Sequence, residues 1–340
     1  MSSRAPDLYW PMPCTLRAAA DDSGRRLDRI LRKALPELPL SALHRFLRQG
    51  KILVDGRRGK AAELIQAGAE ISLPDISAIH KDDDSSGGEK PENAPLPPVL
   101  FEGAGLLVFN KPVGMAVHGP ESLDTLVQFY LKTRLPASLS FKPGPLHRLD
   151  KPTSGIVVFS TNLEGARRFS ALLREGRVKK TYLALVQGQI RGSEVWEDAL
   201  VRDHDLQKTF TGGRLQHKPP EKSQGMNIRR MNVRRALTRI SPLASVPGFS
   251  LVRAEIETGR THQIRAQAAA HGHPLAGDRK YGGSFQSGGL LLHAWMLETD
   301  EAAAEFPRGF PAITAPLPEA FRRRVEEIFG RHLGTEGFFP

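Results

Sequence analysis

Residues 145–155 read PLHRLDKPTSG and lead directly into the apolar run Ile156–Phe159. An apolar run of this length is typical of a buried strand, so Asp150 should lie on a loop at the edge of a core. Arg148 and Lys151 flank it in the sequence. An aspartate that only caps a turn would give the same local pattern, so this stretch alone does not establish a functional site.

Two further segments are unusually polar for positions that enter a core. Residues 179–186 predict a strand in which Tyr182 is the one phenol among aliphatic residues, although a core tyrosine with a bonded hydroxyl would look the same. Residues 258–265 place six polar residues around the start of a predicted helix. Each segment has an ordinary structural explanation, but their joint occurrence favours a single polar site.

Around these segments, short β-rich runs alternate with helical patterns, and no internal repeat is visible. The pattern predicts strands at 106–109, 156–159, 182–186 and 251–256, and helices at 123–131, 163–173 and 262–270. Such a mixture indicates a mixed α/β or α+β domain.

A separate small unit precedes this domain. Its expected elements are an amphipathic helix with apolar residues at 27, 30, 31 and 34, a second helix capped by Ser41 and ended by Gly50, and strands at 52–54 and 69–73. A unit of this size builds only a small core. We therefore expect it to be an accessory module.

Composition divides the chain into four segments. Residues 1–24 show no periodicity and are expected to form a flexible tail, and the small unit spans 25–75. Residues 76–98 are rich in Asp, Ser, Gly and Pro and predict a linker, and the main domain spans 99–340. Two domains joined in this way could hold one long ligand with raised effective concentration.

The positive charge is clustered. The chain has 48 Lys and Arg against 37 Asp and Glu, a formal net charge of +11. Residues 24–60 contain eleven Lys and Arg but three acids, and residues 206–239 contain nine but one acid. Such clusters attract polyphosphates, of which nucleic acid is the commonest.

Several cations are candidates for phosphate contact. Arg45 and Arg48 are three residues apart and should share a helix face, with Lys51 and Arg57 nearby. A solvated charged face is the alternative interpretation. We interpret the basic segment 203–234 as an RNA-facing loop, although an insertion without a role would have the same composition.

Other classes of protein are disfavoured. No apolar run approaches the ~20 residues that span a bilayer, so no membrane partner is expected, and the N-terminus lacks a secretion signal. A single cysteine, Cys14, excludes a disulfide framework within the chain, and a cytoplasmic location is expected. Phosphate-loop, dinucleotide and zinc motifs are absent. His271-Gly-His273 reads as a turn, so neither a metal nor a cofactor is expected.

Several motifs together resemble one known family. They are Asn110-Lys-Pro-Val-Gly-Met-Ala-Val-His118, His147-Arg-Leu-Asp-Lys-Pro-Thr-Ser-Gly155, the Tyr182 strand, Gly259-Arg-Thr-His-Gln-Ile-Arg265, Gly272-His-Pro-Leu-Ala-Gly-Asp-Arg-Lys-Tyr-Gly282, Leu292-His-Ala-Trp295 and Ala315-Pro-Leu-Pro318. In this order they resemble the RluA-type pseudouridine synthases, over about Leu100 to Pro318. The 25–75 unit is similar to the S4 RNA-binding module that precedes the catalytic domain in ribosomal members.

This resemblance implies an α+β fold, with a mixed and mainly antiparallel sheet and flanking helices behind a small α/β S4-like domain. It also implies cofactor-free isomerisation of uridine in RNA to its C-glycoside. Asp150 matches the essential aspartate, Tyr182 the active-site tyrosine and Arg265 the arginine that pairs with the aspartate. Arg148 matches the residue that fills the gap left by the extruded base. Arg260, His262 and Gln263 are further expected RNA contacts.

The implied chemistry is physically sensible. The carboxylate must be ionised, either to attack C1′ or to remove a sugar proton and give a glycal, and the sequence does not choose between these routes. Burial alone would raise the pKa of such a carboxyl group, which a guanidinium within about 4–6 Å would counteract. Extruding a base costs a few kcal/mol, and an inserted guanidinium could offset part of that cost.

We therefore expect a monomeric enzyme that modifies uridines in 23S ribosomal RNA or its large-subunit precursor. A tRNA pseudouridine synthase of the same family is the alternative within this class. A catalytically silent RNA-binding factor of ribosome assembly is another, although RNA binding alone needs none of Asp150, Tyr182 and Arg265. A uracil-excising glycosylase would need a positioned water in place of closure onto C5.

Overall fold

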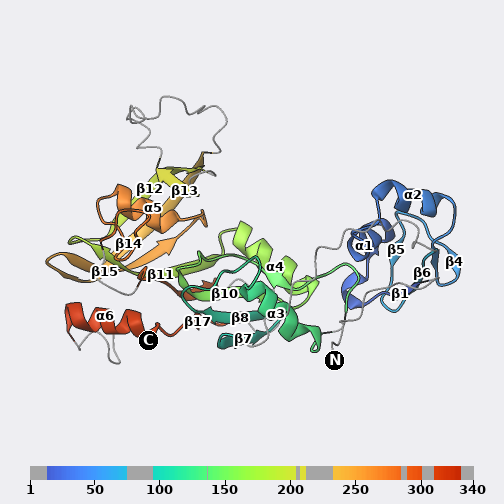
Figure 1. The fold of residues 1–340 in the computed structure, drawn as a ribbon, viewed down its shortest axis with the longest axis horizontal. Helices are drawn as coiled ribbons and strands as arrows, with labels where there is room; N and C mark the ends of the chain where they lie inside the picture. The colour runs from blue at the N-terminus through green and yellow to red at the C-terminus, as the bar shows by residue number, and fades with distance from the viewer. Residues whose placement is uncertain are drawn as a thin grey trace, which may run out of the picture.

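The computed structural model describes residues 14–74, 95–135, 137–203, 207–211, 233–284, 289–300 and 310–330. Within these ranges the chain forms a small N-terminal unit and a larger sheet-based domain, which lie beside each other along the long axis of the molecule (Figure 1). No helix in the described ranges is both long and apolar enough to cross a membrane.

Two helices pack on short strands in the N-terminal unit. The helices are α1 (Leu27–Ala34) and α2 (Leu40–Arg48), and the strands are β1 (Thr15–Arg17), β2 (Arg25–Arg26), β3 (Leu53–Val54), β4 (Arg57–Arg58), β5 (Leu64–Ile65) and β6 (Glu70–Ser72). The sheet order is β1-β6-β3-β4, and β2 pairs with β5. Leu27, Ile30 and Leu31 are fully buried, as the apolar stripe predicts.

The unit begins earlier than the sequence predicts. β1 pairs with β6 and buries Leu16 in the core of the unit, so residues 14–24 are not the expected flexible tail. A three-residue strand is too short to show periodicity, which explains the error. Ser41 is also not the cap of α2, because the helix starts one residue earlier behind Pro39, whose ring restricts φ. Residues 1–13 and most of the 76–98 linker lie outside the described ranges.

The larger domain is built on one sheet. Its strands are β7 (Val99–Gly103), β8 (Leu106–Lys111), β9 (Gly144–Pro145), β10 (Ser154–Ser160), β11 (Val178–Gln187), β12 (Glu194–Asp203), β13 (Lys208–Thr211), β14 (Arg234–Val246), β15 (Phe249–Ile256), β16 (Leu292–Thr299) and β17 (Ile313–Thr314). The order is β13-β12-β14-β15-β11-β16-β10-β8-β7. Among the described strand pairs only β10–β16 is parallel, which confirms the mixed, mainly antiparallel sheet.

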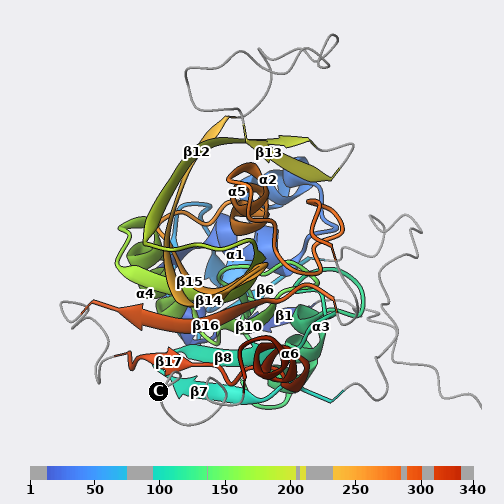
Figure 2. The ribbon, with the colours of Figure 1, turned by 90° about the vertical axis from the view of Figure 1, so that its left-hand side faces the viewer.

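Helices cover both faces of this sheet (Figure 2). They are α3 (Leu123–Lys132), α4 (Leu163–Arg174), α5 (Gln263–Ala270) and α6 (Glu319–Phe329). Val157 and Phe159 of β10 pack in a cluster with residues of α3 and α5, whereas Ile156 and Val158 pack in a cluster with residues of α4. Because successive side chains of a strand point to opposite faces, a strand covered on both faces has the continuous apolar run seen at 156–159.

A glycine joins the 145–155 loop to the sheet. Gly155 has a φ of 109°, and a Cβ atom there would lie 2.1 Å from the carbonyl oxygen of Ala294. Only glycine allows both this φ and this approach. The loop that carries Asp150 is thereby held directly beside β16.

A buried carboxylate joins the N-terminal unit to the larger domain. Asp22 has no exposed surface, and its two oxygens accept hydrogen bonds from the Ser138 hydroxyl and from the amides of Leu139 and Ser140, at 2.9–3.0 Å. The Ser140 hydroxyl donates as well. Arg25 in turn donates to the carbonyl and hydroxyl oxygens of Ser140. We call this contact the seam.

Candidate active site

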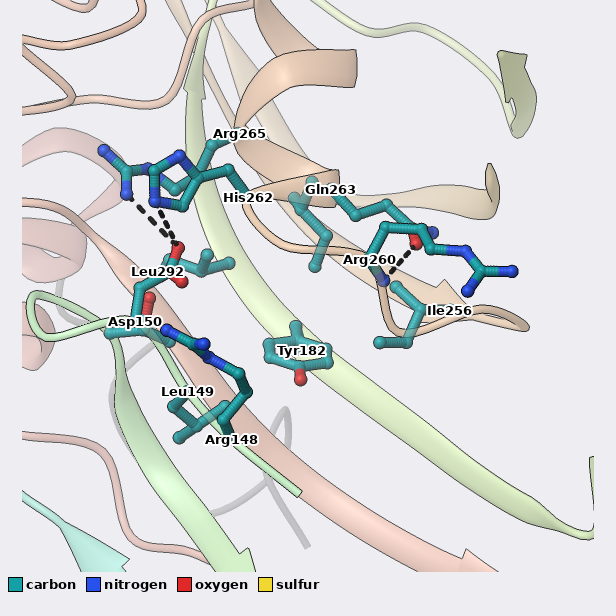
Figure 3. Close-up of a pocket in the computed structure, with 12 residues that line it drawn as sticks. Arg148, Leu149, Asp150, Tyr182, Ile256, Arg260, His262, Gln263, Arg265 and Leu292 are labelled. Atoms are coloured by element: carbon teal, nitrogen blue, oxygen red, sulfur yellow. Dashed lines mark hydrogen bonds and ion pairs between the residues drawn. The ribbon is translucent and has the colours of Figure 1, made fainter. Parts of the chain in front are cut away.

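Asp150 lies in a pocket beside the central strands β15, β11 and β16 of the sheet. The pocket is a solvent-open hollow of about 370 Å³, lined by Arg148, Leu149, Asp150, Thr153, Tyr182, Ile256, Arg260, His262, Gln263, Ile264, Arg265 and Leu292. The Asp150 side chain is 15% exposed, so its carboxylate is largely buried yet accessible to a ligand. The structure thus brings together the three residues predicted to be catalytic, Asp150, Tyr182 and Arg265 (Figure 3).

Arg265 on α5 connects two carboxylates. Its Nη1 donates to Asp150 Oδ2 at 3.2 Å, while its Nε and Nη2 donate to the two oxygens of Asp278 at 2.7 and 2.8 Å. Burial alone would lower the pKa of Arg265, but the hydrogen bonds and charges of Asp278 and Asp150 raise it above its ordinary value. The guanidinium therefore stays charged, and Asp278 fixes its direction.

His262 faces the same carboxylate. Figure 3 shows His262 and Arg265 both directed at one oxygen of Asp150, and His262 Nε2 lies 3.6 Å from it. Burial, together with nearby cations, lowers the pKa of His262 to about 4 although the charge of Asp150 opposes this shift. The imidazole is therefore neutral near pH 7.

Tyr182 on β11 is buried beside Asp150. Burial, and then the negative charge of Asp150, raise the pKa of its phenol above the ordinary value. The residue is therefore a neutral phenol at physiological pH. It can stack on a base or donate a hydrogen bond, but it is a poor source of phenolate for general-base catalysis.

Lys111 holds the Asp150 loop through hydrogen bonds to backbone carbonyls. Its side chain is fully buried at the end of β8, and its Nζ donates to the carbonyls of Pro112, Met115 and Lys151, at 2.9, 2.8 and 3.3 Å. Burial lowers its pKa to about 8, against the opposing charge of Asp150. Lys111 belongs to the motif at 110–118 but had no predicted role, although a lysine that ends a buried strand was the available signal.

The expected RNA contacts of this domain separate into two groups. Arg148 and Arg260 are exposed at the pocket. Gln263, by contrast, is 3% exposed, its amide oxygen accepts from Thr258 Oγ1 and the Arg260 amide, and its nitrogen donates to Leu237 and Thr238. Gln263 lines the pocket with its polar groups bonded to the protein, so its contact with RNA stays a prediction.

The expected RNA contacts of the N-terminal unit lie apart from this pocket. Arg45 and Arg48 are exposed on α2, as their spacing predicts, and Lys51 and Arg57 are exposed nearby. Arg48 also lines a second hollow, together with Ser41, His44, Leu47, Arg58, Gly59, Lys60 and Ala61. Of the basic 203–234 segment, the described part consists of Asp203, β13 with Gln207, Val233 and the start of β14.

No metal-binding group of His, Cys, Asp and Glu is found among the described residues. His271 instead bonds the carboxylate of Asp198 at 3.1 Å and stacks on Trp196, and His273 bonds the carbonyl of Gln187 at 3.0 Å. Both histidines of the His-Gly-His sequence thus have structural partners.

The chain is similar in sequence to proteins named ribosomal large subunit pseudouridine synthase C. Ribosomal large subunit pseudouridine synthase C of Vibrio vulnificus (strain CMCP6) is 31% identical over 320 residues, 91% of this chain and 94% of the relative. The protein of the same name from Escherichia coli (strain K12) is 31% identical over 321 residues, with the same coverage of both chains.

Solved structures and a family model agree with this likeness. The fold is similar to that of Human RNA Pseudouridylate Synthase Domain Containing 4, with a TM-score of 0.52, 23% identity and coverage of 68% of this chain and 92% of that one. Residues 105–270 match the RNA pseudouridylate synthase family model. The chain belongs to the RNA pseudouridylate synthase family.

Proposed function

We propose that this protein converts uridines to pseudouridine in the RNA of the large ribosomal subunit, 23S rRNA or its precursor, with Asp150 as the reacting acid. The observation that carries the proposal is the Asp150 carboxylate, accessible in a pocket, 3.2 Å from the charged Arg265 and beside the neutral phenol of Tyr182. The relatives named as ribosomal large subunit synthases support the choice of RNA.

The reaction needs no change of oxidation state. The N1–C1′ bond of uridine breaks, the uracil turns, and a C5–C1′ bond forms while C5 loses a proton and N1 gains one. Asp150 either attacks C1′ or removes a sugar proton, and Arg265 stabilises the negative charge that either route requires. Tyr182 lies where its ring can stack on the uracil and hold it during the turn.

The exposed arginines beside the pocket favour a uridine within RNA over a free nucleoside as the substrate. Arg148 and Arg260 are exposed beside the pocket, where they can bind phosphates or fill the space that a flipped base leaves. The target uridine must leave its stack for its sugar to reach the Asp150 carboxylate in the pocket.

The N-terminal unit is the second RNA-binding element in this proposal. We expect it to act as an S4-like arm, because it carries the exposed cations Arg45, Arg48, Lys51 and Arg57. The unit lies at the opposite end of the molecule from α5 and β15 (Figure 1). Phosphate contacts there would add affinity that falls with salt, without adding sequence readout. We expect a monomer that acts in the cytoplasm, where ribosomes are assembled.

Pseudouridine mapping across all rRNA and tRNA from cells with and without the gene tests the proposal. We expect particular 23S rRNA positions to lose the modification, and the wild-type gene to restore it. Loss confined to tRNA would move the enzyme to the alternative substrate. Unchanged pseudouridine throughout would favour the silent assembly factor and would contradict the proposal.

A further inference from the structure

His262 has an unusual backbone conformation beside the active site. It immediately precedes α5 and has a φ of 55°, in the left-handed region that non-glycine residues seldom adopt. Such a conformation persists only where the surrounding structure holds it. Contacts of both the backbone and the side chain of this segment supply that restraint.

Thr209 and Tyr281 provide these contacts. The hydroxyl of Thr209, on β13, donates to the carbonyl of Thr261 at 2.9 Å and so holds the residue before His262. The amide of Thr209 donates to the hydroxyl oxygen of Tyr281 at 2.8 Å. That hydroxyl lies 2.8 Å from Nδ1 of His262, and the two rings meet edge to face.

These hydrogen bonds favour one tautomer of His262. The Tyr281 oxygen accepts from an amide, so its own proton is available for Nδ1. Nδ1 is then the acceptor of the neutral ring, and Nε2 carries the hydrogen. The other end of the ring favours the same arrangement, because Nε2 lies 3.6 Å from Asp150 Oδ2 and a bare nitrogen lone pair there would repel the carboxylate.

We propose that Tyr281 is a positioning residue for the reaction: its hydroxyl holds His262 as the Nε2–H tautomer, so that an N–H group faces the carboxylate of Asp150. This inference rests on the proposed role of Asp150. The distance of 3.6 Å is longer than a hydrogen bond, and catalytic contacts of this kind shorten when the substrate is bound. The imidazole N–H then orients the carboxylate together with Arg265.

Burial, together with nearby cations, keeps the ring neutral. Asp150 favours protonation of His262, whereas burial, Arg265 on α5, Arg202 on β12 and Lys280 beside Tyr281 oppose it. A neutral ring can donate only one hydrogen, so the tautomer decides whether that hydrogen points at Asp150. The Tyr281 hydroxyl therefore acts on the Asp150 carboxylate through His262, without a contact of its own to Asp150.

Tyr281 also has packing contacts that the test must preserve. Its ring lies in a cluster with Leu200 and Ala236, 5.1 Å from the guanidinium of Arg265 and 5.0 Å from Lys208 Nζ. Tyr281→Phe keeps the ring and removes the hydroxyl. Tyr130→Phe is the matched control, since Tyr130 is a partly buried tyrosine on α3 whose ring packs under Arg134.

Two measurements test the proposal on the full-length protein. The first is ¹⁵N NMR of the histidine rings in the wild type, which we expect to show Nε2–H for His262 at pH 7. The second is single-turnover kinetics on an rRNA fragment. We expect Tyr281→Phe to lower the rate constant by about tenfold, to leave RNA affinity within about twofold of the wild type, and to mix the two tautomers. Tyr130→Phe should change none of these quantities.

The outcomes separate this inference from the proposed function. An Nδ1–H tautomer in the wild type, or a wild-type rate constant for Tyr281→Phe, would overturn the role of Tyr281. The wild-type NMR measurement needs no variant, so a Tyr281→Phe protein that failed to fold would leave the proposal testable. Asp150→Asn is measured in parallel, because wild-type turnover by that variant would refute the role of Asp150 on which this inference rests, whatever the tautomer, whereas no turnover by the wild type would refute the proposed function.

Discussion

Asp22 in the seam and Asp150 in the pocket are both aspartates removed from bulk water, yet their surroundings differ in kind. Asp22 accepts from neutral amides and hydroxyls, which use both of its oxygens. Asp150 accepts a side-chain hydrogen bond from the guanidinium of Arg265 and has a pocket in front of it. A carboxylate saturated by fixed donors holds two units together, whereas one with unused lone pairs and a charged neighbour can react.

The same isosteric substitution should therefore act on different quantities at the two sites. At the pocket it should remove the chemistry and leave the fold. At the seam it should weaken the fold and leave the chemistry. Each prediction below changes one feature of this contrast, in order of decreasing expected effect.

Asp150→Asn should have the largest effect, a loss of pseudouridine formation on the order of 10³-fold or more. The amide oxygen can still accept from Arg265 Nη1, so we expect RNA affinity and folding to stay close to the wild type. Single-turnover assays and binding to the same rRNA fragment measure both quantities. Asp300→Asn, which changes an exposed carboxylate paired with Arg177, is the control. Equal turnover by Asp150→Asn and the wild type would remove Asp150 from the mechanism.

The motifs around Asp150 could be read from the sequence because they are local. The apolar run 156–159 and the polar residues before it lie side by side in the chain, and the resemblance placed Tyr182 and Arg265 in the same site. The 272–282 motif contains Asp278 and Tyr281, but their pairing with Arg265 and His262 could not be found in this way. Asp278 and Tyr281 lie on an irregular loop, and only the fold brings them to Arg265 and His262.

Long-range contacts explain the other differences from expectation. Asp22 was assigned to a flexible tail because its partners lie 116 to 118 residues further along the chain. The long strands β12 and β14 were not predicted, because neither shows a regular apolar alternation. β12 buries Asp198 and exposes Val195, and β14 buries the consecutive residues 236–238. Such a strand can be recognised only when the residues that pack against it are known.

Asp22→Asn should destabilise the protein by about 2–4 kcal/mol. One carboxylate oxygen accepts from the amides of Ala19 and Leu139, and the other accepts from Ser138 and Ser140. An asparagine NH₂ group at either oxygen would meet at least one backbone N–H that cannot rotate away. Denaturant unfolding measures the loss, and the rate constant of the chemical step should stay within about twofold of the wild type.

Asp21→Asn is the matched control for this variant. Asp21 accepts one bond from the amide of Leu163, at 2.9 Å, which an asparagine oxygen can also accept. The control should cost less than about 1 kcal/mol. An equal loss in both variants would mean that negative charge, rather than the donor arrangement of the seam, provides the stability.

Acid should reduce the advantage of Asp22 over asparagine. Burial would raise the pKa of Asp22, but the hydrogen bonds from Ser140, Ala19, Leu139 and Ser138 outweigh burial and lower the pKa below its ordinary value of 3.8. A lowered folded-state pKa gives stability that is fully present above the unfolded-state pKa and is lost as pH falls through the folded-state pKa. The difference in unfolding free energy between the wild type and Asp22→Asn should thus be constant from pH 7 to 5 and shrink below pH 4. A difference that grows in acid would contradict this sign.

Arg25→Gln should have the smallest effect, below about 1 kcal/mol. Arg25 is a cation near a buried carboxylate, as Arg265 is, but it donates to the carbonyl and hydroxyl oxygens of Ser140, at 3.1 and 2.8 Å. The Ser140 hydroxyl then donates to Asp22, so Arg25 strengthens that bond by polarising the hydroxyl between them. Unfolding of the double variant Arg25→Gln/Asp22→Asn measures this coupling. Because the two groups share one hydroxyl, the double variant should lose less unfolding free energy than the sum of the losses in the two single variants. Strictly additive losses would mean that Arg25 acts on the Ser140 loop alone.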